Sequence, residues 1–278
     1  MSLPALFHIA FYRFVRVADP TAIAAALRRS TSGLLGQVLV APEGINGTLA
    51  GTTAALDTFK DALRHAPDLD GLFVDLRCIR TACRTPPFQQ LKVHVRGEVL
   101  PLGVGGVDPI GRRGRQLNPA QWKALLGAGD AVVIDNRNHF EYRLGHFRGA
   151  TDPKVGNFRD LPRFIEAHAA DWKARGQPVA MYCTGGIRCE KTAAWMSDAF
   201  GLEVLQLEGG ILRYLAESAD AAAGAESDWQ GECFVFDNRI ALDSKLCETP
   251  TTAADVYADE SDEAWRLRRA MRLALPTP

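Results

Sequence analysis

The sequence predicts an α/β and α+β fold divided between two domains. The chain has 278 residues, and globular domains typically take about 100–200 residues each. In the first part, the predicted elements follow the order β-α-β-β-α-β. In the second part, strands alternate with helices, which is typical of a parallel sheet covered by helices on both faces. The hydrophobic fraction of 47% and the charged fraction of 23% exclude a largely disordered chain.

Local patterns predict each element of the first domain. Short apolar runs with aromatic residues predict strands, and apolar residues at helical spacing predict helices. Pro42–Gly47 contains two glycines and an asparagine, so we expect a turn there. The resulting order is the split βαβ arrangement of ferredoxin-like domains, which we assign to residues 1–102. The predicted elements are strand Leu6–Phe14, helix Thr21–Arg29 (started by Asp19 or Pro20), strand Leu35–Ala41, strand Thr48–Ala50, helix Thr52–His65, strand Gly71–Arg77, and a hairpin of Lys92–Val95 with Glu98–Leu100.

A second domain is expected after a linker. Residues 103–118 are rich in Gly and Arg and lack periodicity, which is typical of a linker. We expect the parallel-sheet domain at residues 119–225 and a less regular C-terminal extension at 226–278. In that extension, Phe234 and Phe236 belong to a strand-like segment that we expect to cover an open edge of the core. The predicted elements are helix Pro119–Leu126, strand Ala131–Asp135, helix Phe158–Ala174, strand Pro178–Cys183, helix Gly186–Phe200, strand Val204–Leu207, helix Ile211–Ala216 and a helix at Asp262–Leu275.

The net charge of −1 hides a difference between the two parts of the chain. Residues 1–118 contain 14 Lys and Arg against 9 Asp and Glu, whereas residues 119–278 contain 18 against 24. A basic first part favours an anionic partner, and a chance distribution of solvated charges explains it equally well. No apolar run reaches the roughly 18–20 residues of a membrane-spanning helix, and the N-terminus lacks the pattern of a signal peptide. We therefore expect a cytoplasmic protein with no membrane partner.

The six cysteines are not spaced as zinc ligands. No two of them form a CxxC pair, so we expect no metal site. Scaffold disulfides are not expected either, because the chain shows no secretory signal. Each cysteine is therefore either a buried apolar side chain or a reactive thiol, and its surroundings must decide. The cysteines are Cys78, Cys83, Cys183, Cys189, Cys233 and Cys247.

Cys183 directly follows a short apolar strand and precedes a helix. The segment Pro178–Ala194 reads PVAMYCTGGIRCEKTAA, a strand–loop–helix turn at the carboxyl edge where open parallel sheets place ligands. The backbone N–H groups of this loop would form an anion-binding nest, and the helix dipole favours a thiolate. We therefore expect the pKa of Cys183 to fall below its ordinary value of about 8.5, helped by the charge of Arg188. The loop residues are Thr184, Gly185, Gly186 and Ile187.

Two other interpretations of this loop are less favoured. A strand-end cysteine alone is more often structural, but the TGG that follows it and the arginine five residues on favour a reactive thiol. Protein tyrosine phosphatases separate their cysteine and arginine by five residues to wrap a phosphate. Only four residues separate Cys183 from Arg188, so we do not expect phosphatase activity.

The second domain resembles a rhodanese domain over residues 119–220. The resemblance implies that Cys183 carries a persulfide, as rhodanese cysteines do. Asp135, Arg137 and Glu141 would be charges that pin the active-site side. We expect Glu141 and His146 to tie the connecting loop to the sheet. The four matching motifs are VIDNR at Val133–Arg137, EY and GHFRGA within Glu141–Ala150, the loop Cys183–Arg188, and LEGG at Leu207–Gly210.

The resemblance extends over nearly the whole chain, to about Leu242. The segments APEGINGTLAG, PFQQLKVHVRGEVLPLG, YCTGGIRCEK and GECFVFDNRIAL are similar to those of the rhodanese-containing tRNA uridine hydroxylase family. This resemblance implies an enzyme that uses molecular oxygen to convert the uridine at tRNA position 34 to 5-hydroxyuridine, with Cys183 as the essential cysteine. The C-terminal part departs from the family pattern, because the family often carries a CxxC-containing tail.

Two alternative functions are compatible with the sequence. One is a sulfurtransferase that passes on a persulfide sulfur, and the other is a non-catalytic RNA-binding module. The intact loop cysteine argues against the module, whereas the loop alone does not separate hydroxylation from sulfur transfer. The sequence has no flavin, nicotinamide or non-haem iron motif, so no cofactor is evident and oxygen is the expected co-substrate.

Further residues are candidates for redox chemistry or tRNA binding. Cys189 is either a redox partner of Cys183 or a residue that packs under the loop. Lys191 would contact an RNA phosphate or be solvated, and Glu43–Gly47 would form a hairpin turn or an RNA contact. Basic side chains late in the first domain and in the linker would bind an RNA backbone or be solvated. These are Arg77, Arg80, Arg84, Lys92, Arg96, Arg112, Arg113 and Arg115.

Overall fold

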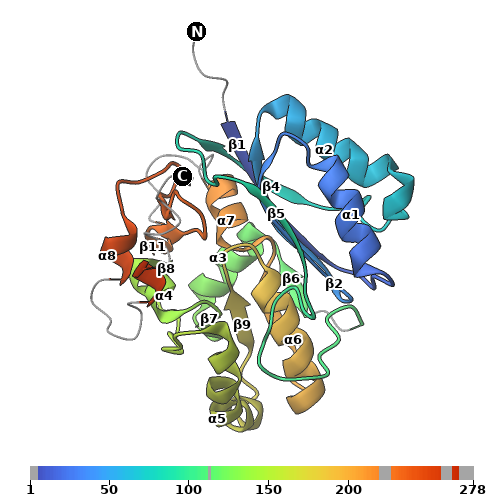
Figure 1. The fold of residues 1–278 in the computed structure, drawn as a ribbon. Helices are drawn as coiled ribbons and strands as arrows, with labels where there is room; N and C mark the ends of the chain where they lie inside the picture. Colours follow the sequence, from blue (N-terminus) through green and yellow to red (C-terminus); the bar gives the residue numbers. More distant parts are fainter. Residues whose placement is uncertain (1–5, 112–113, 219–226, 258–264, 269–278) are drawn as a thin grey trace. The chain divides into compact units, whose positions relative to one another are not determined.

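The computed structural model describes residues 6–111, 114–218, 227–257 and 265–268. The chain divides into two compact units, which Figure 1 shows in sequence colours. The first unit comprises Met1–Leu100 with Asp237–Arg239, and the second comprises Pro101–Phe236 with Ile240–Pro278. A three-residue segment late in the chain therefore belongs to the N-terminal unit.

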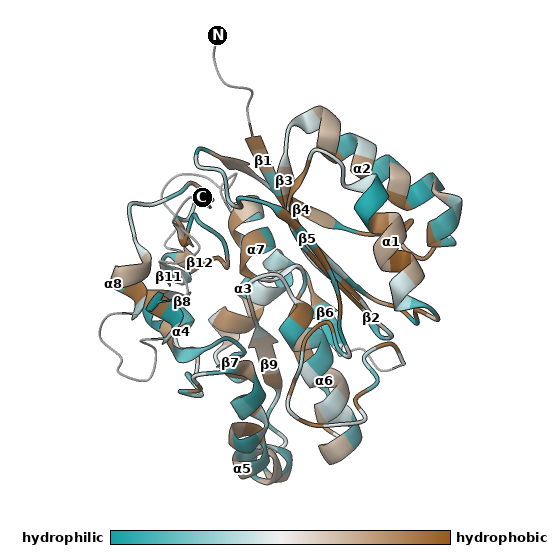
Figure 2. Ribbon diagram, viewed as in Figure 1, coloured by the Kyte–Doolittle hydropathy of each residue, from teal (hydrophilic) through white to brown (hydrophobic). Residues whose placement is uncertain are grey.

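Five strands form the sheet of the N-terminal unit, in the order β4-β1-β3-β2-β5. Neighbouring strands are antiparallel, except that β5 runs parallel to β2. Helices α1 (Pro20–Ser30) and α2 (Thr53–His65) contribute buried side chains to the core, and hydrophobic residues run along the strands (Figure 2). The strands are β1 (Leu6–Phe14), β2 (Leu35–Ala41), β3 (Gly44–Gly51), β4 (Cys78–Cys83) and β5 (Leu91–Val95).

Helix α1 begins at the cap that the sequence indicates. The carboxylate oxygen Oδ1 of Asp19 accepts hydrogen bonds from the backbone N–H groups of Thr21 and Ala22, at 2.9 and 3.0 Å. Pro20 occupies the first helical position, where its missing N–H costs nothing. Asp19 is therefore the N-cap, and Pro20 is the first residue of the helix.

The prediction of a strand at Gly71–Arg77 is wrong. A 3-10 turn, η1 (Pro67–Leu69), precedes a reversal in which Asp70 and Gly71 have φ angles of 49° and 66°. The strand forms later, as β4. Phe73 is fully buried within the irregular stretch, so its hydrophobicity reflects packing in the core rather than a strand.

The turn and the hairpin predicted in this unit also differ from the structure. The predicted pairing of Lys92–Val95 with Glu98–Leu100 does not form. Strand β5 pairs in parallel with β2, and the N–H of Val99 donates to a carboxylate oxygen of Glu43 at 2.8 Å. The predicted turn Pro42–Gly47 is shorter, because β3 already starts at Gly44. This glycine has a φ of 141°, and a Cβ placed there would collide with the carbonyl oxygen of Arg13 on β1.

Four parallel strands form the main sheet of the second unit, in the order β6-β10-β9-β7, with helices packed around it (Figure 1). Two small antiparallel pairs, β8 with β11 and β12 with β13, lie outside this sheet. The strands are β6 (Arg115–Leu117), β7 (Val132–Asp135), β8 (Gly145–Phe147), β9 (Val179–Tyr182), β10 (Val204–Leu207), β11 (Trp229–Gly231), β12 (Cys233–Phe234) and β13 (Ala241–Leu242). The helices are α3 (Pro119–Ala128), α4 (His139–Leu144), η2 (Phe158–Asp160), α5 (Leu161–Ala174), α6 (Ile187–Phe200), α7 (Gly210–Ser218) and α8 (Ala253–Tyr257).

Three segments predicted for the second unit differ in the structure, which also contains α4, β8 and α8 where no element was predicted. Residues 115–117 of the expected linker form β6, the edge strand beside β10. The helix expected at Phe158–Ala174 is a 3-10 turn followed by α5. Most of the helix expected at Asp262–Leu275 lies outside the described residues, and residues 265–268 are helical.

Candidate active site

Cys183 lies at the carboxyl end of β9, in the middle of the parallel sheet. The strand ends at Tyr182, and helix α6 begins at Ile187, so the loop spans four residues. All four residues of β9 are buried, because its neighbours β10 and β7 cover both edges and helices cover its faces. The sequence therefore places the thiol at the sheet edge where α/β proteins bind ligands.

The start of α7 holds this loop in place. The carbonyl oxygens of Cys183 and Thr184 accept hydrogen bonds from the N–H groups of Ile211 and Leu212, at 3.0 and 3.1 Å. Gly210 makes this close approach possible, because a Cβ at that position would collide with the Cys183 carbonyl oxygen. The loop carbonyls are thus turned toward α7, while the N–H of Gly186 points at the sulfur.

The Cys183 thiol is surrounded by donors. The N–H of Gly186 donates to its Sγ at 3.1 Å. Burial raises the pKa of Cys183, but hydrogen bonds from the thiol and backbone N–H of Cys189, the charge of Arg188 and the Gly186 N–H outweigh burial and lower it to about 6. The side chain is therefore mainly a thiolate at neutral pH, which is the nucleophilic form of cysteine. This shift has the direction that the sequence predicts.

Arg188 forms a buried ion pair instead of pointing toward open solvent. Its guanidinium donates to both carboxylate oxygens of Glu141, at 2.7 and 2.8 Å, and to the hydroxyl of Thr184 at 3.1 Å. Burial raises the pKa of Glu141, but the ion pair with Arg188 lowers that pKa by a larger amount, so the carboxylate stays charged. Arg188 therefore anchors the loop to α4 and supplies positive charge near the thiolate.

A second buried pair fixes the neighbouring strand end. The Arg137 guanidinium donates to Asp135 at 2.8 and 2.6 Å and to the carbonyl oxygen of Gly145 at 2.6 Å. The Tyr182 hydroxyl donates to the same carboxylate at 2.7 Å. Both charged side chains are almost fully buried, and their pairing connects the ends of β7 and β9 with the start of β8. These residues hold the sheet edge that carries Cys183.

Comparisons with known proteins match both units. Residues 7–99 match the family model described as the UPF0176 acylphosphatase like domain, and residues 118–217 match the rhodanese-like domain. A protein from Jannaschia sp. (strain CCS1) named tRNA uridine(34) hydroxylase is 42% identical over 243 residues, which cover 87% of this chain and 77% of that protein. A protein of the same name from Mesorhizobium japonicum is 39% identical over 259 residues, covering 89% and 81%. This chain belongs to the tRNA uridine(34) hydroxylase family.

Membership of this hydroxylase family confirms the whole-chain resemblance stated from the sequence. The two domain matches confirm the ferredoxin-like and rhodanese-like fold classes. Among solved structures, a rhodanese-related protein from Thermoplasma volcanium matches 37% of this chain and 92% of its own, with 24% identity and a TM-score of 0.27.

The other candidate site residues have different surroundings in this hydroxylase family member. Cys189 is fully buried, and burial together with its hydrogen bond to Cys183 raises its pKa well above the ordinary value. It therefore stays a protonated thiol that donates to the Cys183 thiolate. Lys191 is 1% exposed, and this burial fits neither of the two alternatives given from the sequence, a solvated side chain or a surface contact with an RNA phosphate. Arg112 and Arg113 lie outside the described residues, and Arg115 is exposed on β6.

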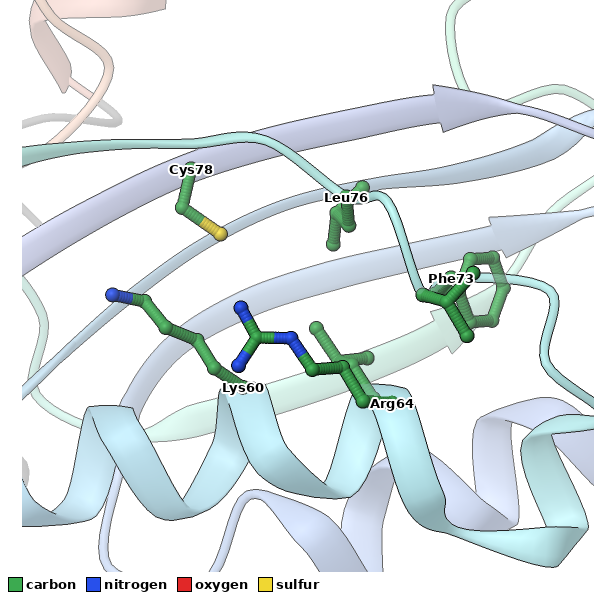
Figure 3. Close-up of a pocket in the computed structure, with 7 residues that line it drawn as sticks. Lys60, Arg64, Phe73, Leu76 and Cys78 are labelled. Carbon is green, nitrogen blue, oxygen red and sulfur yellow. The ribbon is translucent and has the colours of Figure 1, made fainter.

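The N-terminal unit contains a pocket of about 160 Å³ between α2 and β4 (Figure 3). Lys60 and Arg64 project into it from α2, and Cys78 lines it from the strand side. Burial raises the pKa of the Cys78 thiol more than these two cations lower it. Cys78 therefore stays protonated, in contrast to Cys183, and the pocket offers no activated nucleophile.

Within the described ranges, no group of three or more His, Cys, Asp or Glu side chains is arranged to hold a metal ion. In the same part of the chain, no helix is long and apolar enough to span a membrane.

The sequence names two residues whose roles in the site appear only in the structure. Gly210 belongs to the LEGG motif of the rhodanese resemblance, and the structure shows that it sets the approach of α7 to the loop. Phe236 lies beside Arg188, with the guanidinium carbon 5.8 Å from the ring centroid, although we expected its segment only to cover an edge. Tertiary packing determines both contacts.

Proposed function

We propose that this chain hydroxylates carbon 5 of the uridine at tRNA position 34, in the cytoplasm, with Cys183 as the catalytic thiolate. The relatives from Jannaschia and Mesorhizobium bear the name of this activity and align with 87% and 89% of the chain. The observation that carries the residue assignment is the pKa of Cys183, lowered to about 6 at the carboxyl edge of the sheet. Transfer RNA is the macromolecular substrate, and molecular oxygen is the co-substrate.

The thiolate activates the base by adding to carbon 6 of uracil. The S–C6 bond forms as the electrons of the C5–C6 double bond move toward carbon 5 and the carbon 4 oxygen, which makes carbon 5 electron-rich. Backbone N–H groups of the Cys183 loop stabilise the charge on the carbon 4 oxygen if the base lies over them. Attack on molecular oxygen, with uptake of one proton, gives a carbon 5 hydroperoxide.

The balance of the reaction requires a two-electron donor. Two thiols of an external reductant reduce the hydroperoxide to the alcohol, releasing one water and forming one disulfide. Loss of the carbon 5 proton then restores the C5–C6 double bond and expels the Cys183 thiolate. One oxygen atom ends in 5-hydroxyuridine and the other in water.

A competing route places the oxidant on Cys183 itself, as a sulfenic acid, with no bond between sulfur and the ring. An RNA with 5-fluorouridine at position 34 separates the two routes. The adduct route predicts a covalent protein–RNA species that survives denaturation and is missing in Cys183→Ala. Tight binding of this RNA without a covalent species, under turnover conditions, contradicts the adduct.

Rhodanese-type sulfur transfer is the second candidate, because the Gly186 N–H would also stabilise a persulfide on Cys183. The experiment that separates the two functions incubates the purified chain with tRNA, a thiol reductant and isotopically labelled oxygen. Hydroxylation predicts labelled 5-hydroxyuridine by nucleoside mass spectrometry. Thiolated nucleosides or cyanide-dependent turnover of thiosulfate, without 5-hydroxyuridine, would support sulfur transfer instead.

We propose that the tRNA backbone meets basic side chains near the start of the second unit. Arg115 is exposed there, and Arg112 and Arg113 precede it in sequence. Such contacts are electrostatic and carry little sequence information, so they would add affinity while the Cys183 site selects the nucleotide. Of the basic residues in the N-terminal unit, Arg80 is partly engaged, since its guanidinium donates to Thr53 at 2.7 Å and lies over Phe7.

A further inference from the structure

Phe236 is an aromatic side chain exposed to solvent. Its exposed fraction is 60%, the largest of the four exposed large hydrophobic side chains in the described part of the chain. The other three are Val74, Val95 and Trp265, at 39–43%. Single exposed apolar side chains are common on protein surfaces, so the exposure of Phe236 gains meaning only from the position of its ring, which packs on buried rings and lies beside Arg188.

The ring packs against two neighbouring aromatic rings. It packs edge-to-face against Phe234 and Phe140, with centroid distances of 4.9 and 6.4 Å and interplanar angles of 84° and 81°. Those two rings are only 2% and 1% exposed, and they pack with Tyr257 in a small hydrophobic cluster. One side of the Phe236 ring therefore rests on a buried aromatic base, and this contact reduces the ordering that binding through the ring requires.

The same ring contacts the catalytic loop through Arg188. The guanidinium carbon of Arg188 is 5.8 Å from the Phe236 centroid, and the same guanidinium donates to the Thr184 hydroxyl in the loop. Arg188 is committed to its ion pair with Glu141 and does not cover the ring, as the 60% exposed fraction shows. The aromatic surface therefore lies next to the loop that carries the thiolate.

We propose that Phe236 binds the RNA substrate by stacking on a nucleobase of the loop that contains the target uridine. This inference rests on the proposed function. Single-stranded RNA loops are recognised by bases that leave their stack and pack on aromatic side chains, and any base offers a face for this contact. The base that stacks on Phe236 is the target uridine or a nucleotide beside it, and the stack would hold the uracil ring near Cys183.

The test combines variants of the protein with variants of the RNA. Phe236→Leu keeps an apolar side chain and removes the aromatic face, whereas Phe236→Trp restores one. We expect Phe236→Leu to weaken binding of an anticodon stem-loop RNA by roughly tenfold or more and Phe236→Trp to bind like wild type. Trp265→Leu is the control, because it also removes an exposed ring, one that contacts Arg266 rather than Arg188.

RNAs with an abasic site at position 34, or at either flanking position, identify the stacked base. Wild type should lose affinity for one of these RNAs, and Phe236→Leu should bind that RNA and the intact RNA alike, so the two changes are coupled. KM should rise in Phe236→Leu, while the alkylation rate of Cys183 stays unchanged. In Phe236→Trp, addition of the RNA should quench fluorescence beyond the wild-type change.

The outcomes separate this inference from the proposed function. If wild type forms no 5-hydroxyuridine, the proposed function fails whatever Phe236 does. If wild type is active but Phe236→Leu binds all four RNAs like wild type, the stacking contact does not exist. Equal losses in Phe236→Leu and Trp265→Leu would also contradict it, because the effect would then not be specific to the ring beside Arg188. A loss of self-association in Phe236→Leu with unchanged RNA binding would assign the ring to an interface between copies of the chain.

Discussion

Arg188 and Glu141 form a bidentate ion pair, at 2.7 and 2.8 Å, whose side chains are 8% and 0% exposed. Glu141 also accepts a hydrogen bond from the N–H of Asn138 at 3.1 Å, which places its carboxylate at the start of α4. The pair thus joins the first turn of α4 to the first turn of α6. It keeps a positive charge beside Cys183 without leaving the guanidinium free to move.

Removing the carboxylate of this pair should destabilise the fold. We expect Glu141→Gln to lower the free energy of unfolding by about 3–5 kcal/mol, because it leaves the buried Arg188 charge without a counter-charge. The pKa of Cys183 should not rise, since Arg188 remains. Urea unfolding measures the first effect, and alkylation of Cys183 against pH measures the second.

Glu217→Gln is the matched control for this variant. Its carboxylate pairs with Arg213 at 2.7 Å, and its side chain is 49% exposed, so we expect a loss below about 1 kcal/mol. Equal stability of the Glu141 and Glu217 variants would show that the buried pair contributes no more than a surface pair.

The Cys189 thiol should lower the pKa of Cys183 through its hydrogen bond. Cys189→Ala removes this donor from a charged acceptor, so we expect the Cys183 pKa to rise by about one to two pH units. Cys189→Ser keeps a donor and should hold the pKa near that of wild type. The pH midpoint of Cys183 alkylation, located by peptide mass spectrometry, checks both variants. An unchanged midpoint in the alanine variant would rule out the thiol as a donor.

Gly210→Ala should displace the loop that carries Cys183. The residue has a φ of 64°, and the new Cβ would collide with the carbonyl oxygen of Cys183. We expect a large loss of hydroxylation, and a higher alkylation midpoint as the Gly186 contact is lost. Gly185→Ala is the control, because a Cβ there meets nothing within 4 Å, and its alkylation midpoint should match wild type. A normal midpoint in Gly210→Ala would show that α7 does not position the loop.

The lowered pKa of Cys183 makes stability depend on pH. The folded state holds the thiolate from about pH 6, whereas the unfolded chain ionises near 8.5. The stabilisation is fully present above the unfolded value and is lost as pH falls through the folded value. The difference in unfolding free energy between wild type and Cys183→Ser should therefore grow by about 1.4 kcal/mol per pH unit between about pH 6 and 8.5. A constant difference across this range would contradict the lowered pKa.

The loop that carries Cys183 could be predicted because its signals are local. An apolar strand, a cysteine, two glycines and an arginine follow one another within Val179–Arg188. The surroundings of the Cys183 thiol therefore come largely from residues next to it in the sequence. The partners of this loop are remote in sequence. Glu141 is 47 positions from Arg188, and Phe236 reaches the same guanidinium from the C-terminal part, so only the folded chain shows these contacts.

The errors in the fold have the same origin. Gly71–Arg77 contains apolar residues that fit a strand, but two successive residues with positive φ place Phe73 in the core as part of a turn. β5 pairs with β2 rather than with the residues that follow it. Strand pairing across a sheet depends on contacts between distant residues, which periodicity in a short window does not report.

A comparison of wild type with Cys183→Ser in one assay of tRNA hydroxylation tests the role of the Cys183 thiolate most directly. Both proteins are first shown to be folded by circular dichroism and to bind the tRNA. Nucleoside mass spectrometry then measures 5-hydroxyuridine at position 34 after reaction with oxygen and a thiol reductant. We expect 5-hydroxyuridine with wild type and none above background with Cys183→Ser. Equal product from the folded serine variant would show that the Cys183 thiolate does not perform the chemistry.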